Sequence, residues 1–71
     1  PHPRMFERAL APLGVAPADA VHVGDLRRTD VAGGRAFGMR TVRIRGAFDD
    51  TGDLPDADAV VDAHAELLEL L

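Results

Sequence analysis

The chain has 71 residues, a formal net charge of −4 and no cysteine. A chain of this length forms one small domain at most and buries only roughly 60% of its unfolded surface. The lack of cysteine excludes disulfides and thiolate metal sites and fits a reducing, cytoplasmic location. The apolar runs are too short to span a membrane, no signal peptide is recognisable, and the acidic balance argues against nucleic acid as a partner. Because the first residue is Pro1 rather than Met, we expect a piece of a longer protein.

The first predicted element is an amphipathic helix that begins at Pro3. Its apolar residues fall at i, i+3, i+4 and i+7, on one helical face, and proline is favoured at the first helical position. Gly14 is suited to end this helix, and Pro12 should distort its last turn because proline lacks an N–H. Residues 15–19 predict a short connection with a helical turn begun by Pro17. The apolar face consists of Phe6, Ala9, Leu10 and Leu13.

Ala20–Val23 is predicted as the first strand and is apolar enough to be buried on both faces, as in a parallel sheet. His22 interrupts the apolar run. We interpret it as a core or sheet-face histidine with one hydrogen bond rather than as a catalytic residue.

A helix is predicted from about Thr29 to Phe37, with Thr29 as its cap and Gly38 just after its end. Gly33 and Gly34 each cost about 1 kcal/mol relative to alanine inside a helix. We therefore expect this helix to pack closely on the sheet.

Met39–Arg45 is predicted as the second strand. Val42 and Ile44 share one face, whereas Arg43 and Arg45 share the other. This alternation is typical of a strand near a sheet edge or with one face in water.

Gly46–Asp58 is predicted as a loop that carries five aspartates. The acidic cluster suggests calcium, but its spacing does not match the EF-hand pattern, and a solvated surface loop is favoured. A short strand, Ala59–Val61, follows, and then a C-terminal helical segment from Asp62, which is available as a cap. The loop aspartates are Asp49, Asp50, Asp53, Asp56 and Asp58, and the leucines at helical spacing are Leu67, Leu68 and Leu71.

The predicted element order is therefore α-β-α-β-loop-β-α. Strands that alternate with helices indicate an α/β fold with a parallel sheet and right-handed crossovers. We expect three short strands with helices on both faces, and no internal repeat or domain boundary is visible.

Two carboxylates, Asp25 and Asp30, follow the first strand at a sharp turn marked by Gly24. Ligands of open α/β sheets bind at this end of the strands. Two carboxylates brought together there repel each other unless a cation lies between them, and hard oxygen ligands suit Mg²⁺. The alternative is that Asp25 caps the turn and Asp30 caps the helix without any metal, and the pattern by itself leaves both interpretations open.

Three separated stretches resemble the haloacid dehalogenase (HAD) superfamily of hydrolases. Val21–Val42, with Gly-Asp-x4-Asp, resembles the fourth motif of the superfamily together with the helix and strand after it. Pro1–Phe6 resembles the residues that follow the third-motif lysine, and Asp56–Asp62 with the leucine-rich end resembles the last strand and helix. The three stretches agree in order and spacing over essentially the whole chain.

The resemblance implies a partial Rossmann-like core and Mg²⁺-dependent hydrolysis of phosphate esters through an aspartyl-phosphate. Asp25 would be a direct or water-bridged Mg²⁺ ligand, and Asp30 a second ligand or a support for the metal's surroundings. The substrate would be a small phosphorylated metabolite. A dehalogenase would not need these acids, so Asp25 and Asp30 favour phosphate chemistry.

The chain also departs from the family pattern. No Asp-x-Asp nucleophile motif and no lysine occur, so residues 1–71 correspond to the carboxyl-terminal part of a HAD-like core domain, without its nucleophile half or cap. Leu26 and Thr29 replace the small polar and amide residues often found inside the fourth motif. We expect this piece to be inactive alone, and unstable or self-associating, because the family's nucleophile strand would cover the edge of the first strand.

Two other hypotheses remain. The first is a non-catalytic α/β interaction module whose parent has lost its catalytic residues. The second is a nucleotide-binding Rossmann domain, which is disfavoured because no Gly-x-Gly-x-x-Gly follows a strand. Arg27 and Arg28 could face an anionic substrate, but two solvated arginines in a loop are the favoured interpretation.

Overall fold

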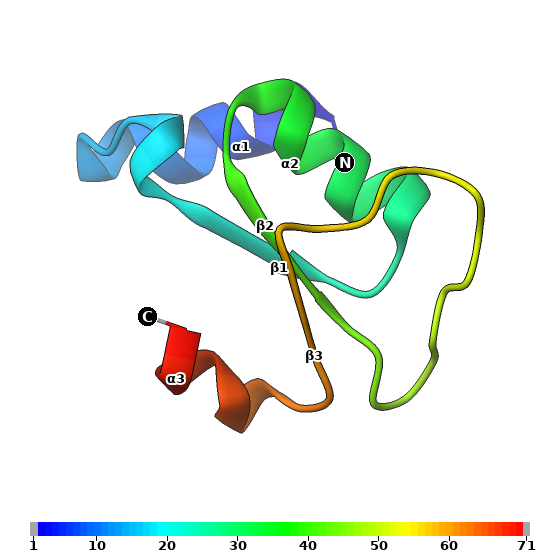
Figure 1. Cartoon of the computed structure of the whole chain (residues 1–71). Coiled ribbons are helices and arrows are strands. Elements are labelled where there is room, and N and C mark those ends of the chain that lie inside the picture. The colour runs from blue at the N-terminus through cyan, green and yellow to red at the C-terminus, as the bar shows by residue number, and fades with distance from the viewer. Residues whose placement is uncertain (1, 71) are drawn as a thin grey trace.

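A computed structural model describes residues 2–70 as a three-stranded sheet between two layers of helices (Figure 1). All three strands are parallel, in the order β1-β2-β3. The predicted α/β class and element order are confirmed. The elements are α1 (Pro3–Leu10), η1 (Ala11–Leu13), η2 (Pro17–Asp19), β1 (Val21–Gly24), η3 (Arg27–Val31), α2 (Ala32–Phe37), β2 (Arg40–Ile44), β3 (Ala59–Val61), η4 (His64–Glu66) and α3 (Leu67–Leu70).

The register of the sheet assigns side chains to its two faces. Val21 pairs with Arg40 and Val23 with Val42, while Val42 pairs with Ala59. Since side chains alternate along each strand, His22 and Thr41 point to the opposite face. β2 therefore lies at the centre of the described sheet and has a neighbour on each side, so the edge position, one of the two placements expected for it, is wrong.

The first helical layer, α1 and α2, covers the face of His22 and Thr41 (Figure 1). The ring of Phe6 on α1 meets the His22 imidazole edge to face, with centroids 4.9 Å apart. A Cβ added to Gly34 of α2 would lie 2.7 Å from Thr41 Cγ2. The close helix–sheet packing expected from the glycine pair is thus confirmed at Gly34.

The second layer is the short α3, on the other face of the sheet. Its Leu67 and Leu70 border a small cavity together with Val21 and Val42. Leu71, expected on this helix, lies outside the described residues. The expected Asp62 cap is wrong: η4 begins after Ala63 without a side-chain cap, and the Asp62 carboxylate instead accepts a hydrogen bond from Arg45.

The core is small, as the length predicts. α1, η3, β2 and β3 each contribute one buried apolar side chain, and Met39 between α2 and β2 contributes the fifth. No helix among residues 2–70 is long and apolar enough to cross a membrane. The buried apolar residues are Phe6, Val31, Met39, Val42 and Val61.

Pro12 and Gly14, at the end of α1, act as predicted. The helix tightens into the 3₁₀ turn η1, which contains Pro12, and Gly14 then takes the left-handed conformation with φ of 64°. Gly38 closes α2 in the same way, with φ of 93°.

The start of the second helix differs from the prediction. The helix begins at Arg27, not Thr29, with the wide π-helical turn η3, and Leu26 stands at its cap position without a side-chain hydrogen bond. Thr29 is thus inside the helix and does not cap it. Asp30 instead accepts hydrogen bonds from the backbone N–H groups of Asp25 and Leu26, ahead of the helix. β1 also runs one residue later than predicted, to Gly24.

Candidate functional site

Asp25 is the first residue after β1, at the carboxyl end of the parallel sheet. Its side chain is exposed, and no described residue donates a hydrogen bond to its carboxylate. It therefore offers free oxygen ligands at the edge where ligands of such sheets bind. Asp25 also borders a cavity of about 250 Å³ with Phe48 and His64, which come from the segments after β2 and β3.

Asp30, in contrast, uses both oxygens of its carboxylate. Oδ2 accepts hydrogen bonds from the backbone N–H groups of Asp25, at 3.1 Å, and Leu26, at 3.3 Å. Oδ1 lies 3.1 Å from His22 Nε2. Burial raises the pKa of Asp30, but the hydrogen bonds from His22 and the two N–H groups outweigh it, so this pKa lies below its ordinary value. Asp30 is thus an ionised carboxylate that holds the turn carrying Asp25.

Gly24 allows Asp30 to reach this turn. A Cβ at Gly24 would lie 2.1 Å from Asp30 Cγ and 2.3 Å from its Oδ2, far inside van der Waals contact. Any larger residue at this position would displace the carboxylate. The glycine before Asp25 is therefore required by the packing of Asp30.

His22 acts as the sequence predicts, as a half-buried sheet-face histidine with one hydrogen bond. Because the carboxylate of Asp30 is ionised and can only accept, the proton of this hydrogen bond belongs to His22 Nε2. The Phe6 ring packs against the imidazole in an edge-to-face arrangement. His22 thereby orients Asp30 rather than facing a ligand.

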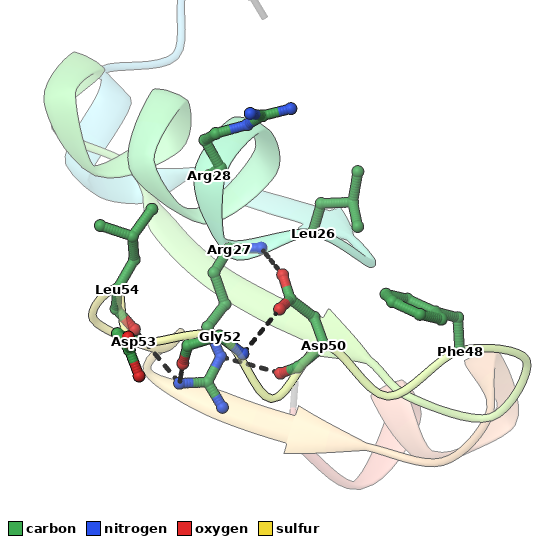
Figure 2. A pocket seen from close by; sticks show the side chains of 8 residues that line it. All are labelled: Leu26, Arg27, Arg28, Phe48, Asp50, Gly52, Asp53 and Leu54. Atoms are coloured by element: carbon green, nitrogen blue, oxygen red, sulfur yellow. Dashed lines mark hydrogen bonds between the residues drawn. The ribbon is translucent and has the colours of Figure 1, made fainter.

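Arg27 is not solvated, which corrects the prediction for the first of the two arginines. Its guanidinium donates to the backbone carbonyls of Asp50, Gly52 and Leu54 at 3.0–3.1 Å and lies 3.2 Å from a carboxylate oxygen of Asp56. Arg27 therefore ties η3 to the loop after β2. Arg28 is exposed, as expected, and Figure 2 shows it pointing away from that loop.

Arg43 is also buried rather than wet, with an exposure of only 3%. It makes two hydrogen bonds to Asp56, at 2.8 and 3.1 Å, and one to Asp49, at 2.8 Å. These two carboxylates raise the pKa of Arg43. The hydrogen bonds from Arg43 in turn lower the pKa of Asp56 to about 2.

The loop 46–58 is a mostly exposed surface loop, as the sequence favours, but its aspartates also make it a scaffold. Four of its five aspartates accept hydrogen bonds from arginine side chains or backbone N–H groups. Asp58, for example, accepts from the N–H of Thr41 at 2.9 Å, and Asp50 from that of Arg27 at 2.8 Å. Their partners are up to 23 residues away in the sequence. No local signal could have identified these pairs.

The turn and the loop together border an open pocket of about 450 Å³, which Figure 2 shows from close by. Leu26 and Phe48 form part of its wall. Arg27 crosses its floor with its guanidinium occupied by the loop. The pocket therefore offers apolar surface but no free cation from Arg27.

The donor set fits a hard divalent cation only in a limited way. Among residues 2–70, no three histidine, cysteine, aspartate or glutamate side chains come close enough to hold a metal ion by themselves. Asp25 provides one free carboxylate among the described residues, whereas both oxygens of Asp30 accept hydrogen bonds. Mg²⁺ in proteins commonly has one or two carboxylate ligands and completes its shell with water and substrate phosphate, so Asp25 as ligand and Asp30 as support are compatible with such a site.

The comparisons with known proteins agree with this fold. The model of the HAD-hydrolase-like family matches residues 1–69. A glyceraldehyde 3-phosphate phosphatase of Methanopyrus kandleri is 40% identical over 77 aligned residues, which cover 100% of this chain and 32% of that protein. A phospholysine phosphohistidine inorganic pyrophosphate phosphatase of Bos taurus is 37% identical, over 100% of this chain and 28% of that protein.

Solved structures give the same result. A HAD phosphatase of Thermococcus onnurineus superposes with a TM-score of 0.82 and 33% identity, over 97% of this chain and 31% of that one. A p-nitrophenyl phosphatase of Archaeoglobus fulgidus has a TM-score of 0.81 and 27% identity, over 99% and 30%. The chain thus spans about a third of the length of the relatives it matches. With its parallel sheet, its Gly-Asp turn and a family match over nearly all its residues, the chain belongs to the HAD-hydrolase-like family.

Proposed function

We propose that residues 1–71 form the carboxyl-terminal part of the core domain of a Mg²⁺-dependent phosphatase, to which Asp25 contributes a metal ligand. The observation that carries this proposal is the contrast at the end of β1. Asp25 has an exposed carboxylate that no described residue hydrogen-bonds. Both carboxylate oxygens of Asp30, in contrast, accept hydrogen bonds, from His22 and from the N–H groups of the turn. The relatives that match are named phosphatases, which supports phosphate chemistry.

Asp25, Asp30 and His22 have separate roles in this proposal. Asp25 binds the cation directly or through water. Asp30 fixes the backbone of Asp25, and His22 fixes Asp30. When bound, Mg²⁺ would neutralise negative charge on the phosphoryl oxygens and so stabilise the transition state.

The backbone of this turn cannot supply that stabilisation. The N–H groups of Asp25 and Leu26 donate to Asp30, and the N–H of Arg27 donates to Asp50. All three are directed at protein carboxylates and not at a ligand. A phosphoryl group therefore depends on the cation and on positive groups from other parts of the protein.

The chemical step would use an aspartate outside these 71 residues. Its carboxylate would attack phosphorus as the ester P–O bond breaks, and a second aspartate, also outside these residues, would protonate the departing alkoxide. The same aspartate would then take a proton from the water that releases phosphate from the aspartyl-phosphate. The substrate would be a small phosphorylated metabolite. The remaining part of the protein, or a second copy of the chain, would also cover the free edge of β1, which pairs only with β2 among the described residues.

Asp25→Asn in the full-length protein tests this function. We expect phosphatase activity to fall at least about 100-fold, because the variant loses a ligand charge at the metal, and Mg²⁺ binding measured by calorimetry without substrate to weaken in parallel. Asp19→Asn is the matched control, because Asp19 is exposed in η2, lines neither pocket, and no described residue pairs with its carboxylate. Unchanged turnover and Mg²⁺ affinity in Asp25→Asn would contradict the role of Asp25, whereas a wild-type protein without phosphatase activity would favour a non-catalytic interaction module.

A further inference from the structure

Three successive backbone N–H groups of the turn, those of residues 25, 26 and 27, are held by two carboxylates from different parts of the chain. Asp30 accepts from the first two. Asp50, from the loop after β2, accepts from the N–H of Arg27 through Oδ2 at 2.8 Å. This is the shortest of the three hydrogen bonds, and it joins residues 23 positions apart in the sequence.

Arg27 donates two hydrogen bonds to Asp50, one from its backbone and one from its side chain. The side chain of Asp50 accepts from the backbone of Arg27, and the backbone carbonyl of Asp50 accepts from Arg27 Nε at 3.0 Å (Figure 2). The Asp50 carboxylate is itself fixed, because its Oδ1 accepts the N–H of Gly52 at 2.9 Å. These N–H groups lower the pKa of Asp50 and keep it ionised at neutral pH.

The carboxylates of Asp30 and Asp50 tie the turn to different elements. Asp30 lies on the helix that follows the turn, so it fixes the turn relative to that helix. Asp50 lies in the loop that leaves β2, the strand beside β1, so it fixes the turn relative to the sheet. A metal ligand needs its position held to within about 0.5 Å. Asp30 is tied to β1 through His22, and Asp50 adds a second tie from the loop after the neighbouring strand.

We infer that Asp50 is a positioning residue for Asp25, holding the turn so that the Asp25 carboxylate meets the cation in the right place. This inference rests on the proposed function. Asp50 need not touch the metal or the substrate to do this. It acts through the backbone of Arg27, two residues beyond Asp25.

The test is a comparison of Asp50→Ala, Asp50→Asn and Asp49→Ala in the full-length protein, with Mg²⁺ affinity measured by calorimetry in the absence of substrate. We expect Asp50→Ala to raise the Kd for Mg²⁺ about 10-fold, the lower end of what supporting residues contribute. Its kcat at saturating Mg²⁺ should stay within a few-fold of the wild type. Asp50→Asn should have a smaller effect, because its amide oxygen still accepts from Arg27.

Asp49→Ala is the matched control. Asp49 is the neighbouring aspartate, and it pairs with Arg43 rather than with the turn. It should lower stability somewhat and leave Mg²⁺ affinity unchanged. Equal Kd values in the wild type, Asp49→Ala and both Asp50 variants would overturn the inference, even if the Asp50 variants melt at lower temperature. If Asp50→Ala does not fold, the Kd of Asp50→Asn for Mg²⁺ decides the outcome.

Asp25→Asn in the same series separates the two proposals. Loss of Mg²⁺ binding in Asp25→Asn together with unaffected Asp50 variants would overturn the role of Asp50 alone. Wild-type Mg²⁺ binding in Asp25→Asn would overturn the proposed function and the inference with it.

Discussion

The turn 24–30 and the loop 46–58 both carry carboxylates, yet they use them in opposite ways. The turn has only Asp25 and Asp30, and it leaves the first of them free. The loop has five aspartates, and four of these are bound to arginines or to backbone N–H groups. The more acidic segment is thus the structural one, and the sparser segment presents the ligand. The density of acidic residues is a poor guide to a metal site, because what matters is which carboxylates remain without protein donors.

The arginines explain this difference. Arg27 and Arg43 project into the loop and bind its carbonyls and carboxylates, which neutralises the acidic cluster. No described arginine pairs with Asp25. The same kind of side chain is therefore a scaffold in one region and a candidate ligand in the other.

The largest expected effect comes from the packing of the turn. In Gly24→Ala the new methyl group would overlap Asp30, whose displacement also breaks its hydrogen bonds to the turn. We expect the full-length protein to lose about 3 kcal/mol of unfolding free energy in urea titrations. In Gly52→Ala the atom nearest to the added Cβ is a carboxylate oxygen of Asp50 at 3.0 Å, so this loop variant should lose much less unfolding free energy. Equal losses in the two variants would show that the turn is no more tightly packed than the loop.

The second prediction concerns the scaffold. Arg43→Met keeps the apolar stem but leaves Asp49 without its cation and Asp56 with Arg27 alone. We expect a loss of about 2 kcal/mol in the same titrations, below the usual cost of breaking a buried pair because both aspartates are partly exposed. Arg45→Met is the control, since the Arg45–Asp62 pair is half-exposed, and its melting temperature should match that of the wild type. A similar melting temperature in Arg43→Met would contradict the scaffold role of the loop.

The smallest effect is a dependence on pH. The folded-state pKa of Asp56 is about 2, below its ordinary value of 3.8, so the unfolded chain takes up the proton first as the pH falls. The contribution of this carboxylate is complete above about pH 4 and is lost as the pH falls toward 2. We expect the wild type to lose about 1 kcal/mol more than Asp56→Asn between pH 5 and pH 2.5, allowing for solvent screening. Parallel pH profiles of the two proteins would refute this.

The sequence predicted the local features of the fold because their signals are local. Pro3, Gly14 and Gly38 mark helix ends by the backbone conformations they allow, and the structure has them in those roles. The apolar run ending at Gly24 predicted the strand and the turn within one residue. The expectation that Thr29 caps the helix failed because Asp30, one position later, reaches back to the N–H groups that a cap would bind.

The sequence by itself determined the α-β-α-β-loop-β-α order, the family and the position of Asp25 and Asp30 after β1. Only the tertiary structure decided that Asp25 stays free, that Asp30 and Asp50 hold the turn, and that Arg43 is buried with Asp56. The reason is physical: helix and strand periods act over a few residues, whereas arginine and N–H donors that engage Asp50, Asp56 and Asp58 lie 13 to 23 residues away in the chain. Those partners meet only when the sheet has formed.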